Sequence, residues 1–340
     1  MWRFIMRKVY LMVLLVSTLL FGAQRPGAVF LLIWPGARAT ALSGAYAAIA
    51  EDATACYYNQ AGLAFIDKTM ITLQHANWLP GLHPDMYYEY AGVVKPFKMG
   101  TVGLNIIYLT TGETRVVDEQ GIYKGTYTTF DIAVGLNYGF KLNQNLGLGL
   151  GWKFIYSYLV PDWVWKQLPG LGIDQGGTGI TYGFDVGVLY KPFRFLALAG
   201  ALQNIGPDIS YTESGAADPL PYTLRLAMRF EPINTQIIRI ALTSDVTKIL
   251  VGMFADEDKS FFENVQYEFE EAWKAVGLEV AYYNFVRLGI GYFIDTEGAR
   301  KGFTYGGGIR AGGFSLDIGV DQSIYDFDTT NRKFSLSYQF

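Results

Sequence analysis

The chain contains 340 residues, of which 51% are hydrophobic, 16% aromatic and only 17% charged, with a formal net charge of −4. A soluble globular domain usually carries about 25% charged residues. Nucleic-acid-binding proteins present clustered Lys and Arg, and this sequence has no such cluster, so we expect no nucleic-acid partner. One Cys and two His exclude an internal disulfide and a Cys/His metal site. We therefore expect no metal and no cofactor.

The first 23 residues have the organisation of a secretory signal peptide. Three basic residues precede an apolar run at 9–21, and the small pair Gly22-Ala23 provides a cleavage site before Gln24. The run is shorter than the roughly 20 residues that a membrane-spanning helix needs. An uncleaved anchor is the alternative. We predict that residues 1–23 are removed.

Residues 24–68 lack a period of two and are rich in small side chains. This composition is poor for a barrel strand and too ordered for a linker. It suits a compact segment with short helices around 39–50. We predict a plug, or hatch, that folds back into the lumen of a barrel formed by residues 69–340.

From residue 69 to residue 340 the sequence alternates between apolar and other residues. Because successive side chains of a strand point to opposite faces, each alternating segment predicts a strand with one apolar face. Most segments have the roughly 9–11 residues that a tilted strand needs to cross a bilayer. We count about 14 such segments, near 69–77, 86–97, 100–110, 127–140, 145–160, 179–192, 195–205, 222–231, 236–247, 274–283, 286–295, 303–311, 314–322 and 332–340.

The connections between these segments are sorted by length. Those after even-numbered segments are tight, at 97–100, 142–144, 193–194, 233–235, 284–285 and 312–313, whereas those after odd-numbered segments are longer. A soluble β-sandwich has no reason to sort its loops in this way. The pattern predicts an all-β, antiparallel outer-membrane barrel of about 14 strands with both termini on the periplasmic side.

Small residues cluster on the faces that this alternation turns inward. They are Gly103, Gly135, Gly139, Gly147, Gly149, Gly151, Ala197, Ala199, Gly289, Gly291, Gly306 and Gly308. Glycine inside a strand often marks the close approach of another backbone, which we interpret as the plug. The alternative is that these glycines only allow the barrel to bend.

Motifs in residues 36–63 resemble the start of FadL-like barrels, notably the PorV/PorQ family. They read Gly36-Ala37-Arg38-Ala39, Gly44-Ala45, Asp52-Ala53 and Tyr58-Asn59-Gln60-Ala61-Gly62-Leu63. In that family the last motif usually ends Asn-Pro-Ala-Gly, and here Gln60 replaces the proline. Similar stretches occur in order at 78–81, 202–211, 220–226, 244–250, 277–284 and 287–292. The plug residues carried over by the resemblance are Gly36, Arg38, Gly44, Asp52, Asn59 and Gly62.

The resemblance implies a 14-stranded outer-membrane barrel that serves type IX secretion. Its implied partners are the translocon, the C-terminal domains of secreted cargo and, as for any such barrel, the outer-membrane lipid. In that role the protein would carry cargo from the translocon toward a surface attachment complex. The alternative is a FadL-like transporter of hydrophobic small molecules. A scaffold barrel without transport is a third possibility.

The long loops carry unusual apolar residues. They are Trp78, Leu79 and Leu82 in the first loop, Trp163, Val164, Trp165 and Leu168 in the third, and Phe262, Val265, Phe269 and Trp273 in the fifth. Exposed apolar patches mark ligand grooves or partner surfaces, and lipid-headgroup anchoring is the alternative. In the fifth loop an acidic run at 256–258 precedes apolar residues at near-helical spacing. We predict an amphipathic helix there that docks a partner; a disordered loop is the alternative.

No arrangement of nucleophile, base and acid is visible, so we expect a protein that is not an enzyme. His75 and His83 stand alone, and we interpret both as structural. Cys56 lies in the predicted plug, and we interpret it as a small buried hydrophobe. The terminal Phe340 comes after Leu336 and Tyr338, and we interpret it as the signal read by the barrel-insertion machinery.

Overall fold

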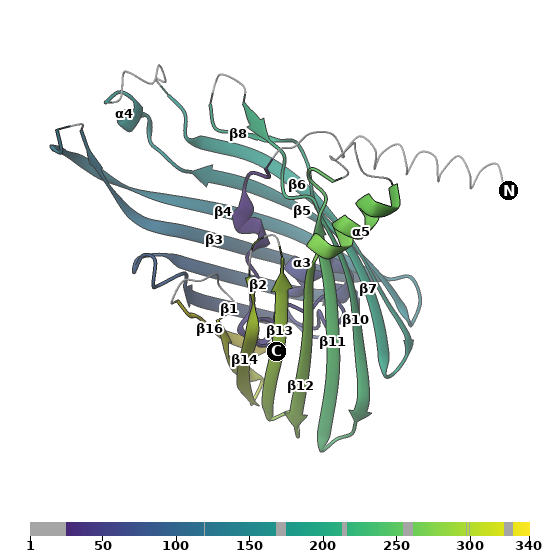
Figure 1. The fold of residues 1–340 in the computed structure, drawn as a ribbon. Coiled ribbons are helices and arrows are strands. Elements are labelled where there is room, and N and C mark those ends of the chain that lie inside the picture. Colours follow the sequence, from purple (N-terminus) through teal and green to yellow (C-terminus); the bar gives the residue numbers. More distant parts are fainter. Residues whose placement is uncertain are drawn as a thin grey trace.

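The computed structural model describes residues 25–118, 120–167, 175–212, 216–253, 261–296, 298, 300–322 and 329–340. The predicted signal peptide, Leu168 and the acidic run at 256–258 lie outside the described residues. Within them, 14 antiparallel strands close into a barrel, as the alternation predicted (Figure 1). A separate two-stranded ribbon, β8–β9, belongs to a loop.

The barrel strands follow one another around the ring in chain order. They are β1 (Met70–Asn77), β2 (Tyr87–Phe97), β3 (Gly100–Val117), β4 (Tyr123–Lys141), β5 (Leu146–Tyr158), β6 (Thr178–Phe193), β7 (Leu196–Ile205), β10 (Thr223–Asn234), β11 (Ile238–Ile249), β12 (Trp273–Tyr282), β13 (Val286–Asp295), β14 (Arg300–Ala311), β15 (Phe314–Asp321) and β16 (Asn331–Gln339). The last strand pairs with the first, from Met70↔Gln339 to Asn77↔Arg332. Closure removes the free edges, whose backbone groups lipid could not satisfy.

Alternation of burial along the strands explains why the sequence forms them. In β6, exposed and buried residues alternate over most of the strand, because its large apolar side chains apart from Leu189 face outward and its small or polar ones face the lumen. Leu288 and Phe303 are among the many large apolar residues exposed on the outer wall, where a bilayer would cover them.

The third and fourth strands exceed their predicted ranges. Beyond Thr110 they form a ribbon that is largely exposed on both faces.

The helices are short and lie in the N-terminal segment or in loops. The segment holds η1 (Val29–Leu32), α2 (Ala37–Ala41), α3 (Ala55–Tyr58) and η2 (Gln60–Phe65), and the loops hold α4 (Asp162–Trp165), α5 (Phe261–Glu271) and the β8–β9 ribbon (Ile209–Ser210 and Ala217–Asp218). Among the described helices, none combines the length and apolarity needed to span a membrane.

Short and long connections are sorted to opposite ends of the barrel. The short-turn end includes the β14–β15 turn at Gly312-Gly313 and the chain end, where the Phe340 amide donates to the Thr69 carbonyl (3.0 Å). At the long-loop end, the Gly27 amide donates to the Pro219 carbonyl (2.9 Å) in the connection between β7 and β10. The described chain therefore begins at one end and finishes at the other. The prediction that both termini lie at the short-turn end is wrong for residue 27, because the N-terminal segment traverses the lumen before β1 begins.

Candidate functional site

The N-terminal segment, residues 25–68 of the described chain, lies inside the ring of strands. Helix α2 packs against β13, β14, β15 and β16, and η2 packs against β3, β4, β5 and β6 on another side of the wall. Figure 1 shows the segment in purple within the barrel. Its large side chains, Tyr46, Tyr58 and Leu42 among them, are fully buried. The segment and the lumenal wall thus cover one another.

Wall glycines make room for this segment. A methyl group on Gly149 would lie 2.6 Å from the Gln60 carbonyl oxygen, and one on Gly291 would lie 2.6 Å from the Leu42 carbonyl carbon. A methyl group on Gly139 would lie equally close, 2.6 Å, to the Leu63 Cβ. Real Cβ atoms essentially never come this close, so the segment backbone requires glycine at these positions of the wall.

Three of the predicted glycines serve the wall itself. Added carbons on Gly135, Gly151 and Gly308 would meet Asn105, Asn137 or Asp317 on neighbouring strands. The expectation that all the inward glycines accommodate the segment is therefore wrong at these three positions. There the wall makes its own polar contacts, such as Asn137 Nδ2 donating to Asn105 Oδ1 at 2.8 Å.

The glycines of the family motif shape the segment itself. Gly36 has φ +89° and Gly44 has φ +77°, a backbone region that favours glycine. A methyl group on Gly44 would lie 2.8 Å from the Trp34 ring, and one on Gly62 would lie 2.6 Å from the Ala50 Cβ and overlap the Ala50 carbonyl. These residues allow the segment to fold tightly enough to fit within the wall.

Arg38 ties the segment to the wall by charge. Its Nε and Nη2 donate to the two carboxylate oxygens of Glu279 on β12, at 2.7 and 2.8 Å. Nη2 also lies 2.7 Å from Glu51 Oε1. Arg229 and Arg239 on the wall approach Glu51 at 3.5 and 3.6 Å. Two-point guanidinium–carboxylate pairs are strong and directional, so this network fixes the segment at one place.

Asp52 and Asn59 close turns within the segment. Asp52 Oδ1 accepts from the Thr54 amide (2.8 Å), and Oδ2 accepts from the Tyr46 hydroxyl (2.6 Å). Asn59 Oδ1 accepts from the Ala61 amide at the start of η2 (3.0 Å), while its Nδ2 donates to the Val188 carbonyl on β6 (3.0 Å). Each is a polar residue at a helix start or turn, where its side chain satisfies free backbone groups.

Gln60 makes a buried contact with the wall that the motif did not predict. Its Nε2 donates to Asp185 Oδ2 on β6 (2.9 Å), which also pairs with Lys153 Nζ (2.8 Å). Asp185 Oδ1 accepts from the amide of Asn204, a non-glycine residue with φ +62° at an irregularity between β6 and β7. A proline at position 60 would lack this side-chain donor. The departure from the family motif therefore has a structural role here.

Lys333 and Trp78 form a second buried contact at the long-loop end. The Lys333 ammonium donates to the Trp34 carbonyl and lies 5.6 Å from the Trp78 and Tyr88 ring centres. Trp78, predicted as an exposed apolar residue of the first loop, is only partly exposed and packs onto the buried cluster around Trp34. Sequence reasoning missed Lys333, whose only signal is a charged residue on an inward-facing strand position.

Two polar cavities open beside the segment at the short-turn end. One, of about 260 Å³, is lined by Arg38, Glu51, Arg239, Arg287, Arg310 and Asp317 among others. The second, of about 450 Å³, includes Glu51, Phe65, Lys191, Arg229 and Glu231. Although burial inside the barrel disfavours a charged carboxylate, Arg38, Arg229 and Arg239 hold the pKa of Glu51 well below its usual range. Glu51 is therefore an anion that three guanidinium groups share.

The predicted residues of the first and third loops are not equally exposed. Leu82 is exposed, whereas Trp163 and Trp165 are half-buried. The Trp163 ring meets Tyr127 edge-on at 6.3 Å, and Trp165 Nε1 donates to the Gly176 carbonyl (3.1 Å). Trp163 thus packs the loop onto β4, and Trp165 ties the loop to its own far end. The third loop therefore offers less apolar surface than its sequence indicated.

The fifth loop contains the helix that its spacing predicted, and the residues that this helix buries are polar. Asn264 and Glu268 are 7% and 8% exposed, and Lys248 on β11 pairs with Glu268 and with Glu271 (3.2 Å). By contrast, Phe262 and Phe269 are 83% and 60% exposed, and Val265 is 42% exposed. Trp273, expected on the same face, instead begins β12 and packs on Phe293 (5.9 Å).

The Cys56 side chain packs among apolar residues, and His83 makes a hydrogen bond within its own loop. Cys56 is buried with Ala53, Leu63, Ile66 and Val94. His83 lies in the first loop, where its Nδ1 accepts from the Asp85 amide (3.3 Å). Across the described ranges, no group of three or more His, Cys, Asp or Glu residues could hold a metal ion.

A closed antiparallel barrel with an apolar outer wall and a polar, chain-filled interior defines the chain as an outer-membrane β-barrel. Its fold is similar to that of the Pseudomonas putida toluene transporter TodX, with a TM-score of 0.54 at 12% identity over 85% of this chain and 94% of that one. The Ralstonia pickettii toluene transporter TbuX is similar with a TM-score of 0.51 at 10% identity, over 85% of this chain and 94% of that one. The TodX deltaS2S3 mutant channel is similar with a TM-score of 0.54 at 13% identity, over 90% of this chain and 98% of that one.

The sequence itself identifies the family. Residues 24–256, more than half of the chain, match the family described as Type IX secretion system protein PorV. The chain belongs to this family, as the motifs at 36–63 indicated, and is an outer-membrane component of type IX secretion. A comparison with curated proteins found no matching sequence.

Proposed function

We propose that the protein acts in type IX secretion by contact with other proteins, as a translocon-associated carrier of cargo. Its partners would be the translocon and the C-terminal domains of cargo, which it would meet at the long-loop end. The short-turn end, with the C-terminus, would face the periplasm, and Phe340 would be read by the barrel-insertion machinery. Phe340 is exposed and continues the outward apolar face of β16, which suits an assembly signal.

The observation that carries the proposal is the orientation of α5. A helix on a protein surface normally buries its apolar face and exposes its polar one. Here Lys248 holds the polar residues Glu268 and Glu271 against the barrel, and Phe262, Val265 and Phe269 face away from it. Such an exposed apolar face needs a partner to cover it. We therefore assign partner docking to this face.

The filled lumen supports a carrier rather than an open pore. The N-terminal segment occupies the interior and is bound to β12 through Arg38 and to β6 through Asn59 and Gln60. We propose that it acts as a plug. A protein that holds its interior closed can associate with a secretion channel without adding a leak to the outer membrane.

Replacement of Phe262, Val265 and Phe269 by Ser tests the docking face. We expect the triple variant to lose co-purification with the translocon from crosslinked cells while remaining heat-modifiable on gels, which reports a folded barrel. The matched control is Gln266→Ser with Glu270→Ser, two exposed polar residues of the same helix, which should retain the complex. Retention by the triple variant would contradict the proposal.

The second candidate is a transporter of hydrophobic small molecules. It is favoured by the aromatic cluster inside the long-loop half, where Trp34 meets Phe293 at 4.7 Å and Trp78 meets Tyr88 at 6.1 Å. Apolar side chains of this kind could bind an apolar solute. Fatty acid or toluene that co-purifies with the wild-type protein, and is lost on Trp34→Ala replacement in a barrel that stays heat-modifiable, would support this candidate over the first.

A further inference from the structure

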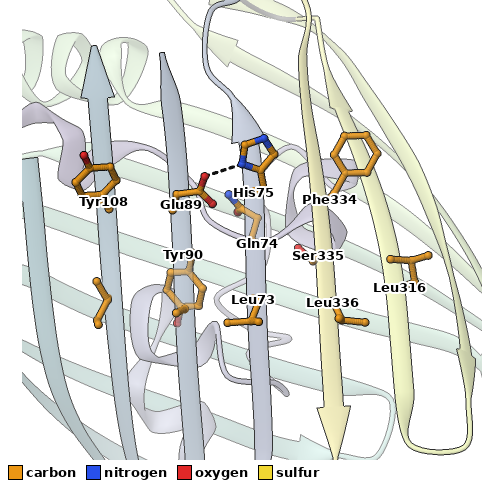
Figure 2. A pocket seen from close by; sticks show the side chains of 12 residues that line it. Leu73, Gln74, His75, Glu89, Tyr90, Tyr108, Leu316, Phe334, Ser335 and Leu336 are labelled. Atoms are coloured by element: carbon orange, nitrogen blue, oxygen red, sulfur yellow. Dashed lines mark hydrogen bonds and ion pairs between the residues drawn. The ribbon is translucent and has the colours of Figure 1, made fainter. Parts of the chain in front are cut away.

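A groove of about 470 Å³ runs along the outer wall across β3, β2, β1, β16 and β15 (Figure 2). Its outward-facing lining consists of Leu73, Ala91, Ile106, Leu316, Phe334 and Leu336, with Tyr108, Glu89 and His75 at one side. This wall faces the bilayer, so the groove lies where acyl chains contact the protein. It is separate from the lumen and from the rim loops.

Cross-strand register explains the groove. Ala91 is opposite Leu73 on one side and Ile106 on the other, and Leu73 is in turn opposite Leu336. The methyl group of Ala91 is far shorter than its neighbours, so the row Ile106–Ala91–Leu73–Leu336 is hollowed at Ala91. One step toward the long loops, Tyr108, Glu89, His75 and Phe334 form the next row.

Polar groups stand at the long-loop side of the groove. His75 Nδ1 lies 2.6 Å from Glu89 Oε1, and His75 Nε2 lies 2.9 Å from Asn77 Oδ1. Both ring nitrogens face oxygen acceptors, an arrangement that suits the doubly protonated, cationic ring. Arg332 is directly opposite Asn77 on β16, and both side chains are exposed on the outer face. With His75 protonated, two cations and one carboxylate leave this cluster with one net positive charge.

The depth of the cluster brings it within reach of a lipid headgroup. From Arg332 to the outward aromatic residue Tyr338, β16 is roughly 20 Å long at about 3.4 Å per residue. Because such strands are tilted by about 35–45°, this length spans roughly 15 Å of membrane depth. The apolar band of such barrels is about 25 Å tall. Arg332 and Asn77 therefore lie in the half of the band on the long-loop side, where the long arginine side chain can extend toward the headgroups. The groove below them lies deeper in the bilayer, at acyl-chain depth.

We propose that this groove binds one phosphorylated, acylated lipid of the leaflet on the long-loop side. An acyl chain would lie over Ala91 between Ile106 and Leu336, and a phosphate would meet Arg332, with the Asn77 amide and His75 beside it. A cation on a lipid-facing strand is costly at membrane depth unless it is compensated, and an anionic headgroup provides that compensation.

A second groove on the same wall provides the contrast. It holds about 370 Å³ and is lined by Met228, Leu242, Ser244, Val276, Leu278, Ile290, Tyr292 and Phe303 among others. It has a small residue, Ser244, at a comparable place, but none of its lining residues is charged. It could accommodate a chain without selecting a headgroup. Selectivity for phosphate is therefore expected at the His75 groove and absent at the Ser244 groove.

Native mass spectrometry of the full, detergent-purified barrel tests the proposal. The probes are lipid A with its phosphates and the same lipid after dephosphorylation. We expect one phosphorylated lipid per wild-type barrel and at least tenfold weaker retention of the dephosphorylated form. Ala91→Phe, which fills the groove, and Arg332→Gln, which removes the cation, should each lower retention of the phosphorylated lipid at least tenfold.

The control is Ser244→Phe, which fills the other groove and should leave retention unchanged. All variants face lipid, and heat-modifiability identifies those that fold. Equal retention of both lipid forms by the wild type, or unchanged retention by folded Ala91→Phe, would overturn the proposal. A photo-reactive residue at position 73 should capture lipid in cells, and capture of a protein instead would also overturn it.

Discussion

Arg38 and Glu279, 241 positions apart in the sequence, form a two-point ion pair inside the barrel, with Nε–Oε2 and Nη2–Oε1 distances of 2.7 and 2.8 Å. The pair joins the N-terminal segment to β12. Arg239 donates to the same Glu279 carboxylate at 3.0 Å, and Glu51 extends the network on the side of the segment. Attachment of the segment thus depends on charge as well as on packing.

Replacement of Arg38 by Gln should loosen the segment. Breaking a buried ion pair costs about 3–5 kcal/mol, and the cost should be toward the lower end because Arg239 still contacts Glu279. We expect faster proteolysis within residues 25–66 and a lower urea midpoint for unfolding. Both are measured on the refolded barrel.

The control for Arg38→Gln is Lys124→Gln. Lys124 pairs with Asp118 at 3.0 Å on the exposed ribbon of β3 and β4, and such surface pairs contribute about 0–1 kcal/mol. This variant should behave as the wild type. Equal proteolysis of the wild type and Arg38→Gln would show that the ion pair does not hold the segment.

The barrel could be predicted from the sequence because strand alternation is local. Each strand carries its own period of two, so the ranges agree with the structure to within a few residues at most ends. The ends of β3 and β4 were missed, because beyond Thr110 both faces are exposed and the apolar alternation stops. The partners of Arg38 and Gln60 were not predictable, because the contacts join residues more than a hundred positions apart.

Gly62→Ala should destabilise the segment. The added methyl group would overlap the Ala50 carbonyl and lie 2.6 Å from the Ala50 Cβ. Overpacking of this kind typically costs about 1–3 kcal/mol, so thermal unfolding should begin at a lower temperature. Gly183→Ala is the matched control, because its methyl group would find the nearest atoms at 3.5 Å, an ordinary contact distance. Similar unfolding of the two variants would contradict the close packing at Gly62.

Attachment of the segment should persist in mild acid. Arg38, Arg229 and Arg239 hold the pKa of Glu51 below its usual range against the opposing effect of burial. A lowered carboxylate pKa adds stability above the unfolded pKa of about 4.3 and loses it as the pH falls through the folded value. Protease resistance of residues 25–66, assayed with an acid-stable protease, should therefore be equal at pH 7 and pH 5. A loss between pH 7 and pH 5 would contradict this assignment.

Deletion of residues 24–66 should open the lumen. The segment fills the interior against β3–β6 and β13–β16, so its removal should give steady single-channel conductance in planar bilayers where the wild type gives little. Unchanged conductance would show that the segment is not a plug and that the wall closes by other means.

The orientation of α5 shows where sequence reasoning stops. The spacing of Phe262, Val265 and Phe269 predicted a helix, and the helix is present. Spacing alone cannot tell whether the apolar side is buried or exposed. The orientation depends on Lys248, which lies on β11, the strand before the helix. Lys248 binds Glu268 and Glu271, and the phenylalanines are therefore turned outward. Likewise, the wall contact of Gln60 depends on Asp185, far away in the sequence.

Crosslinking in native outer membranes, followed by purification of this protein and mass spectrometry, tests the central claim most directly. We predict recovery of a very large barrel protein together with secreted proteins that share one C-terminal domain, and loss of both when Phe262, Val265 and Phe269 are replaced by Ser. Recovery of the protein alone, or with bound fatty acid and no protein partner, would contradict a role as a cargo carrier and favour transport of hydrophobic solutes.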